Sequence, residues 1–332
     1  MKRLATLRSI VIVVAVYVVL QVLISLGLIN PYWQQILSFA GIMAISALGL
    51  NLIYGFTGQF SLGHAAFYGI GAYAAAYLSK SIQSTNPLIL LLGIICGGIL
   101  AGVVAFLIGL PILRLRSDYL GIATLGFGII MKIVFDNADA IIPSLGGSRG
   151  MTGIPRLTSF AWVFAVFVLG IIILRNLVFS SIGRALVSIR EDEVASEAVG
   201  VNTTKYKTIG FVIGCIYAGV AGGLYAHLYS FLHPSNFDFL KSIDVLLIIV
   251  LGGLGSISGT IIIAFAWTFL LEGLRVILPE AILDWRLVIY PLLLIIVMLI
   301  RPKGIFGGRE IKFLFPKPES FKTPINRSET SK

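Results

Sequence analysis

The chain has 332 residues, of which 58% are hydrophobic and 12% are charged, and its formal net charge at pH 7 is +10. A soluble domain carries roughly 25% charged residues, so this composition excludes an ordinary water-soluble protein and predicts a chain embedded in lipid. The basic residues flank apolar stretches, without the interleaved aromatic residues of a nucleic-acid-binding patch, so we expect membrane lipid and no nucleic acid as a partner.

Apolar stretches long enough to enter or cross a bilayer as helices follow one another along most of the chain. The sequence therefore predicts an all-α, polytopic membrane helix bundle with about ten transmembrane segments, some of them broken. The predicted helices cover residues 9–29, 35–54, 61–79, 88–113, 119–136, 159–179, 205–231, 240–254, 257–279 and 285–300.

Residues 1–34 are interpreted as an N-terminal anchor helix that is retained. Lys2, Arg3 and Arg8 precede its apolar run, as they would in a signal peptide. The run is too long for the apolar region of a signal peptide, and no clear small-x-small cleavage site follows it.

The distribution of basic residues predicts the orientation. If the N-terminus is cytoplasmic, ten spans return the C-terminus to the cytoplasm, and most of the 25 lysine and arginine residues then lie on the cytoplasmic side. This agrees with the positive-inside rule. Residues 308–332, which are basic and contain several prolines, are predicted to be a flexible cytoplasmic tail after a membrane domain at 35–307.

Glycines interrupt two of the predicted helices. Residues 119–136 contain Gly121, Gly126 and Gly128, and residues 240–260 contain "GGLGSISGT". Broken helices at membrane depth line cavities in transporters, whereas glycine can equally serve close helix packing. Pairs four residues apart that would place two glycines on one helix face favour packing: Gly98/Gly102, Gly210/Gly214, Gly219/Gly223 and Gly255/Gly259.

The segment "REDEVASEAVGVNTTKYK" at 190–207 is unusually acidic for this chain. Ser188 has the spacing of a helix N-cap that would place Glu191, Asp192 and Glu193 in a first turn, where the helix dipole favours acids. Gly200 would end this short amphipathic helix. Asn202 would then cap the next helix. The segment is either a solvated loop helix or a docking helix for a cytoplasmic partner.

Several motifs that would give the chain its own chemistry are absent. The sequence has no phosphate-binding G-x-x-x-x-G-K-[ST] loop, no H-E-x-x-H and no paired C-x-x-C, and its three histidines do not form a metal-ligand set. We therefore expect neither enzymatic activity nor a bound metal or cofactor. Few ionisable residues lie within the predicted spans, so energy for active transport would have to come from another subunit. A passive channel remains possible from the residues alone.

The acidic segment, read as "GRALVSIREDEVASEAVGVNTTKYK", resembles the cytoplasmic loop of permease subunits in ATP-binding-cassette importers. More closely, residues 35–307 resemble the LivM-type permease subunit of branched-chain amino acid importers. Four further stretches carry this resemblance in the expected order: "GFTGQFSLGHAAFYGIGAYAAAYL" at 55–78, "LRLRSDYLGIATLGFGIIMKIV" at 113–134, "GMTGIP" at 150–155 and "LLIIVLGGLGSISGTIIIA" at 246–264.

The resemblance implies a multi-subunit importer in the bacterial inner membrane. A periplasmic or lipid-anchored substrate-binding protein would deliver leucine, isoleucine or valine to two permease subunits, this chain and a second homologous one. Two cytoplasmic ATPase subunits would bind ATP and Mg²⁺ and move the permeases through a coupling loop at 183–204. The residues that this implies for ATPase coupling are Glu191, Asp192, Glu197, Ala198, Gly200 and Asn202.

The candidates for the translocation pathway come from two of the resembling stretches. They are Gln59, Ser61 and His64 in "GQFSLGH", and Thr124, Gly126 and Phe127 in the segment expected to be broken. The competing interpretation for His64 is a packed histidine at a helix start that bonds a neighbouring carbonyl, and Thr124 and Phe127 could equally serve packing. Two alternative functions remain: transport of urea or short-chain amides by the same kind of importer, and a passive channel.

Overall fold

The computed structural model describes residues 2–82, 86–113 and 117–277, and beyond these residues 292, 295, 296, 299–301, 304–307 and 310. Over these residues the secondary structure is helical, apart from one isolated antiparallel bridge, and this confirms the expected all-α class. Five described segments are apolar and long enough to cross a membrane: Pro31–Phe56, Pro87–Ile112, Tyr119–Asp136, Phe160–Val178 and Thr203–Tyr229.

Nine of the predicted helices correspond to helices in the structure, and the tenth, 285–300, lies almost entirely outside the described residues. Short 3-10 turns, η2 to η5, cover Ala138–Ala140, Pro143–Leu145, Gly147–Arg149 and Pro234–Phe237. The longer elements are α1 (Lys2–Ser25), α2 (Pro31–Leu50) continued by the π-helix η1 (Asn51–Phe56), α3 (His64–Ile82), α4 (Pro87–Ile112), α5 (Ser117–Asp136), α6 (Phe160–Val178), α7 (Ser181–Glu191), α8 (Glu193–Ala198), α9 (Thr203–Tyr229), α10 (Phe239–Gly252) and α11 (Ile257–Ile277).

Asn-Pro pairs begin two of the long helices. The side chains of Asn30 and Asn86 accept hydrogen bonds from the backbone two residues later, and Pro31 and Pro87 occupy the first helical position. Proline suits this position because its fixed φ is helical and its missing N–H would have had no partner there. This local signal explains why α2 begins four residues before the predicted boundary at 35.

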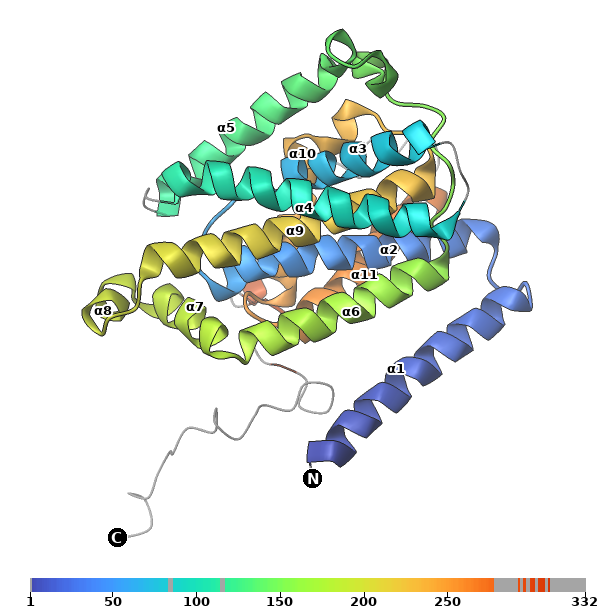
Figure 1. Cartoon of the computed structure of the whole chain (residues 1–332). Helices are drawn as coiled ribbons and strands as arrows, with labels where there is room; N and C mark the ends of the chain where they lie inside the picture. The colour runs from blue at the N-terminus through green and yellow to red at the C-terminus, as the bar shows by residue number, and fades with distance from the viewer. Residues whose placement is uncertain are drawn as a thin grey trace.

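Helix α9 lies at the centre of the bundle, where α2, α3 and α4 pack along it (Figure 1). α1 lies at the periphery and reaches the body at α6, and α7 and α8 protrude at one end. α3, α4 and α9 meet at glycines: a Cβ at Gly97 would lie 2.6 Å from the Gly71 carbonyl oxygen, and a Cβ at Gly71 would collide with Gly219. Backbones therefore touch where side chains are missing, as in other close-packed membrane bundles.

The glycines predicted to break or pack helices have different outcomes. α5 is one continuous helix, so the expected break between residues 119 and 136 is wrong. The second interruption is confirmed, because α10 ends at Gly252 and α11 begins only at Ile257. The pair Gly255/Gly259 does not lie on one helix face, since Gly255 belongs to the turn between these helices. The pair Gly98/Gly102 does pack, against Ile216 and Val220 of α9.

Segments predicted on the same side of the membrane contact one another. At one end, the Met151 amide donates to the Leu232 carbonyl over 2.7 Å, and both belong to predicted outer loops. At the predicted inner side, the Ile305 amide donates over 2.8 Å to the carbonyl of Leu251, which lies near the inner end of the predicted helix 240–254. These contacts agree with the predicted alternation of the chain between two sides. Which end faces the cytoplasm remains a prediction.

The carboxylate of Glu310 caps the start of α11. It accepts the backbone N–H of Ile257 over 2.6 Å, and the N–H and hydroxyl of Ser258 over 3.0 and 2.7 Å. A carboxylate at this position satisfies N–H groups that have no partner in the helix and complements its dipole. Glu310 lies within the predicted flexible tail, yet its side chain is bonded to the folded body.

We expect Gly71→Ala to lower the free energy of unfolding by about 1–3 kcal/mol, because the added methyl group forces the backbones of α3 and α9 apart. Gly273→Ala is the control, since a Cβ at Gly273 would meet no atom within 4 Å among the described residues. Denaturation of the purified chain in detergent measures both. Equal stability of the two variants would contradict the tight crossing at Gly71.

Candidate functional site

Residues 57–63 form a non-helical segment inside the helical body, and we call it the polar segment. It follows the π-helix η1, and the chain leaves η1 through Gly58, whose φ is +77°. The amides of Gly58 and Gln59 still donate back to the carbonyls of Tyr54 and Ile53, each over 3.0 Å. π-helical turns are rare and occur frequently at functional sites.

The polar segment and the start of α3 carry buried polar atoms that have no partner in the described structure. Gln59 is 2% exposed, and neither atom of its side-chain amide is hydrogen-bonded. The same holds for the buried hydroxyl of Ser61 and for Nδ1 of His64. Each such atom costs about 1–3 kcal/mol. A group of them within six residues therefore indicates a place that a ligand, water or another chain completes.

His64 begins α3, and its Nε2 lies 2.9 Å from the carbonyl oxygen of Ser46 in α2. The interpretation of His64 as a helix-start histidine bonded to a carbonyl is therefore confirmed for this ring nitrogen. Its other ring nitrogen and the hydroxyl of Ser46 have no partner among the described residues. His64 thus combines a positioning contact with an unused polar atom.

The structure brings Thr124 of α5 into contact with the polar segment. The Thr124 hydroxyl accepts the backbone N–H of Leu62 and donates to the Gly121 carbonyl, each over 3.0 Å. A Cβ at Gly63 would collide with the Thr124 carbonyl, so α5 and the segment touch through their backbones. Two of the predicted pathway stretches therefore form one site.

The other two candidates on α5 lie differently. The ring of Phe127 packs against that of Phe67 in α3, with centroids 5.1 Å apart. A Cβ at Gly126 would meet no atom within 4 Å, so Gly126 borders open space in the described structure. Phe127 therefore helps to pack α5 on α3, whereas Gly126 makes no contact with the polar segment.

Sequence reasoning missed Asn51, which ties η1 to the turn between α10 and α11. Its side-chain nitrogen donates to the Ser256 carbonyl and to the Thr260 hydroxyl, each over 3.0 Å, and its oxygen accepts the N–H of Gly255 over 2.9 Å. A second missed residue, Ser242 of α10, accepts the Ala65 amide over 2.9 Å. The signal that could have identified Asn51 was the presence of an amide inside a predicted span, because polar groups at membrane depth need partners.

The acidic segment forms two short helices instead of one. Asp192 has extended backbone angles, φ −159° and ψ 112°, and its carboxylate accepts the N–H of Ala195 over 2.9 Å. Asp192 is therefore the N-cap of α8, and the predicted cap Ser188 is wrong, since its hydroxyl donates to the Ala185 carbonyl. The chain remains helical through Ser188 because α7 buries Leu186 and Ile189 against the body.

The predicted end of this helix and the cap of the next one are confirmed. Gly200 has φ +89°, a left-handed conformation that glycine adopts without strain, two residues after α8 ends at Ala198. The Asn202 side chain caps α9 by accepting the Lys205 amide over 2.9 Å.

The Glu197 carboxylate accepts the hydroxyl of Thr203 over 2.6 Å. Because Glu197 belongs to α8 and Thr203 is the first residue of α9, this contact links the short helix to the central helix of the bundle.

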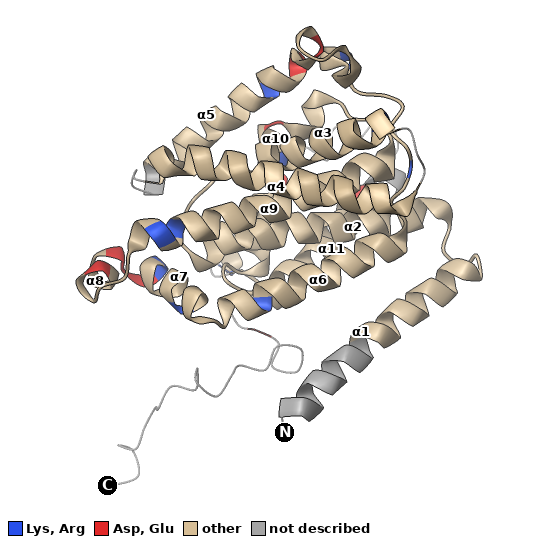
Figure 2. Cartoon of the chain, in the orientation of Figure 1, with Lys and Arg blue, Asp and Glu red and all other residues tan. Residues whose placement is uncertain are grey.

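α8 and the residue after it expose apolar side chains beside charged ones. Val194 is 77% exposed and Val199 is 81% exposed, and Ala198 between them is exposed as well. Acidic residues gather on α8 beside basic residues at the start of α9 (Figure 2). Exposed apolar groups with a charged rim are typical of protein-docking surfaces.

Ion pairs hold the charges around α8. The carboxylate of Glu193 pairs with Lys207 of α9. The carboxylate of Glu191 pairs with the Arg190 guanidinium over 2.5 Å. This hydrogen bond and the adjacent charge lower the pKa of Glu191 below its ordinary value.

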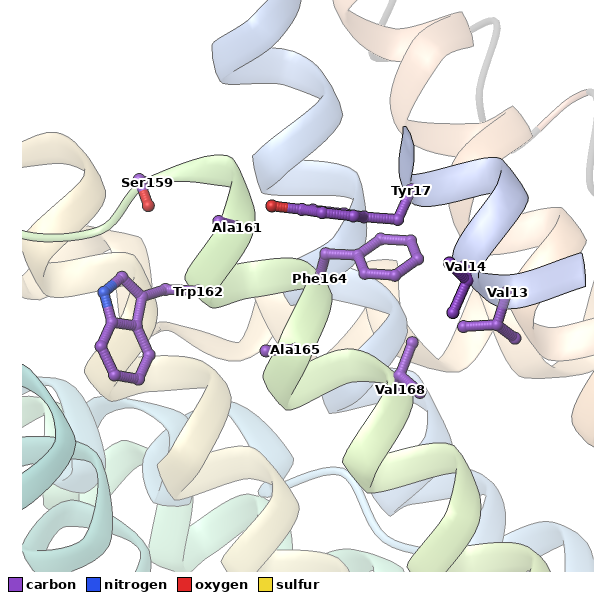
Figure 3. A pocket seen from close by; sticks show the side chains of 9 residues that line it. All are labelled: Val13, Val14, Tyr17, Ser159, Ala161, Trp162, Phe164, Ala165 and Val168. Carbon is purple, nitrogen blue, oxygen red and sulfur yellow. The ribbon is translucent and has the colours of Figure 1, made fainter. Parts of the chain in front are cut away.

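A separate pocket of about 520 Å³ lies between α1 and α6. In Figure 3 the ring of Tyr17 lies next to that of Phe164, and their centroids are 5.1 Å apart. Its lining is mainly apolar and includes none of the predicted site residues: Val13, Val14, Tyr17, Ser159, Ala161, Trp162, Phe164, Ala165 and Val168. Such a lining suits a lipid tail or an apolar helix better than a charged small molecule.

Comparison with known proteins gives concordant matches. Residues 32–298 match the family described as the permease component of branched-chain amino acid transport systems. The high-affinity branched-chain amino acid transport system permease protein LivM of Salmonella typhimurium is 32% identical, over 80% of this chain and 67% of that protein. LivM of Escherichia coli is 31% identical over the same shares.

A second type of permease protein is also similar. LivH of Salmonella typhimurium, which carries the same transport-system name, is 26% identical over 81% of this chain and 92% of that protein. No solved structure matches the chain.

Asn51 and Gln59 allow a test of the polar segment, because both are buried amides but only the Asn51 side chain has hydrogen-bond partners in the described structure. We expect Asn51→Leu to lower the free energy of unfolding by about 1–3 kcal/mol, because it leaves bonded partners unsatisfied. Gln59→Met should leave stability unchanged or raise it, because it removes two unpartnered atoms at similar volume. Denaturation of the purified chain in detergent compares them. A loss for Gln59→Met as large as that for Asn51→Leu would mean that Gln59 is already satisfied.

Proposed function

The chain belongs to the family of permease components of branched-chain amino acid transport systems, and we propose that it is the membrane-spanning permease subunit of an ATP-binding-cassette importer for leucine, isoleucine and valine. The family match over residues 32–298 carries this conclusion. The chain itself performs no catalysis in this proposal. It provides the path, and partner subunits bind ATP and Mg²⁺ and supply the energy.

The surface of α8 is the proposed docking site for an ATPase subunit. It offers two valines and an alanine at one end of the bundle, with Asp192 and Glu197 fixed by capping and by a bond to α9. A rigid protrusion of this kind can transmit a displacement, because its two ends are tied to α7 and α9. Burial of the two valines would contribute about 25 cal/mol for each Å² of apolar area removed from water.

The polar segment is the proposed part of the pathway that meets the amino acid. An apolar amino acid needs polar partners only for its ammonium and carboxylate groups, and Gln59, Ser61 and His64 hold unused donors and acceptors. Thr124 shapes the segment by holding the Leu62 amide. Few polar contacts suit a permease, because a tight site would trap a ligand that a binding protein has already selected.

The full proposal places ten spans in the bacterial inner membrane with both termini in the cytoplasm. The excess of basic residues in the predicted inner segments supports this orientation. The proposed partners are two cytoplasmic ATPase subunits, a periplasmic or lipid-anchored binding protein and a second homologous permease. Similarity to both LivM and LivH, which occur together in Salmonella typhimurium, supports pairing with a second permease.

We expect Val194→Asp combined with Val199→Asp to reduce ATP-dependent leucine uptake strongly and to release the ATPase subunits from the purified complex, because both changes place charge in the docking face. Uptake is measured in proteoliposomes that contain both permeases, the ATPases and the binding protein. Ile141→Asp is the control, since Ile141 is 81% exposed in a predicted outer segment. Uptake that survives the double change would remove the docking role of α8.

The same proteoliposomes test the cargo and the mechanism. Unlabelled isoleucine or valine should compete with labelled leucine, whereas urea should not. Uptake should stop when ATP is omitted, because a permease moves substrate only with its ATPases. Competition by urea would assign the chain to amide transport, and leucine flux through this chain alone without nucleotide would identify a passive channel.

A further inference from the structure

Arg190 joins the protruding helices to the body of the bundle. It lies in the last turn of α7, two residues before Asp192 completes its capping contact with α8. Its Nη1 donates to the carbonyl of Gly55 over 2.6 Å, while Nε and Nη2 donate to Glu191 over 3.2 and 2.5 Å. One planar guanidinium therefore bonds the body through Nη1 and is held by the neighbouring Glu191 carboxylate through Nε and Nη2, a fork that lysine does not have.

The Gly55 carbonyl belongs to the last turn of η1, directly before the polar segment. The last carbonyls of a helix have no N–H partner within that helix. Arg190 supplies a charged donor to one of them, and hydrogen bonds to charged groups are stronger than neutral ones. The bond therefore fixes the point at which the chain leaves the helix and enters residues 57–63.

Glycines form a slot around the Arg190 side chain. A Cβ at Gly58 would lie 3.0 Å from Cγ of Arg190, and a Cβ at Gly255 would lie 2.8 Å from its Nη1. The side chain is 34% exposed, so most of it is enclosed between the start of the polar segment and the turn between α10 and α11. Asn51 joins these two walls, because it bonds Gly255 from η1.

We propose that Arg190 is a positioning residue that transmits displacement of α7 and α8 to the polar segment. When the docked ATPase moves α8, the guanidinium pulls on or releases the Gly55 carbonyl, and the backbone that carries Gln59 and Ser61 shifts with it. This role rests on the proposed function. It assigns to one hydrogen bond the mechanical link between the docking surface and the pathway.

The test separates transport from ATP hydrolysis in the complete importer. In proteoliposomes, Arg190→Gln should lower leucine uptake about tenfold, as expected for loss of a charge-assisted hydrogen bond. ATP hydrolysis and co-purification of the ATPases should remain close to wild type, so that less leucine is moved for each ATP. Leucine uptake by Arg190→Lys should fall between that of wild type and that of Arg190→Gln, because an ammonium can reach the Gly55 carbonyl but cannot also hold Glu191.

Arg175→Gln is the control, because Arg175 lies in the last turn of α6, outside the coupling loop at 183–204, and its side chain makes no hydrogen bond or ion pair with the described residues. Uptake by Arg190→Gln equal to that of the control would overturn the proposal. Parallel loss of uptake, ATP hydrolysis and bound ATPase would also overturn it, because the residue would then serve docking or folding only.

A second measurement does not depend on transport. Hydrogen–deuterium exchange of the purified full chain should increase in residues 55–63 on Arg190→Gln and remain unchanged on Arg175→Gln. Unchanged exchange in these residues would overturn the link, even if the complex transports leucine. Increased exchange together with absence of ATP-dependent uptake by the wild-type complex would keep the link and reject the proposed function instead.

Discussion

The need to satisfy every backbone polar group away from water governs this structure. A helix satisfies most of its backbone N–H and C=O groups with its own hydrogen bonds. The non-helical residues 57–63 and the turn at 253–256 cannot do so, and both are enclosed by helices. Side chains from distant parts of the chain provide the missing partners: Asn51 serves the turn, Thr124 serves Leu62 and Arg190 serves Gly55. Non-helical backbone is tolerated at such depth only where protein encloses it in this way.

These backbone groups have hydrogen-bond partners, whereas several polar side chains beside them have none among the described residues. In one short stretch, the Asn51 side chain makes three hydrogen bonds while the Gln59 side chain makes none with the described residues. The Asn51 hydrogen bonds hold η1 and the turn before α11 in a fixed relation. The Gln59 amide leaves a donor and an acceptor available. A permease needs both, because a rigid frame must surround a surface that accepts a passing solute only briefly. Their proximity places the π-helix between the rigid frame and the proposed pathway.

Much of the fold could be predicted from the sequence because apolar length and helix caps are local signals. The positions of α4, α6 and α9 follow from them within a few residues. The continuity of α5 could not be predicted, since glycine is compatible with both a break and a close contact, and Gly121 and Gly128 face Phe60 and Gly63 of another segment. Ser188 failed as a cap for a similar reason: burial of the preceding turns, a tertiary effect, extended α7 past it.

The candidate site likewise contains residues that the sequence suggested and contacts that it could not suggest. The family resemblance of "GQFSLGH" suggested Gln59 and Ser61, whereas the bond from Arg190 to Gly55 spans 135 positions and no periodicity points to it. The cap that Glu310 forms on α11 is equally remote, 52 positions from Ser258. It has a consequence for biosynthesis. During translation Ser258 is added 52 residues before Glu310, so the amino end of α11 has no carboxylate cap until Glu310 has been synthesised.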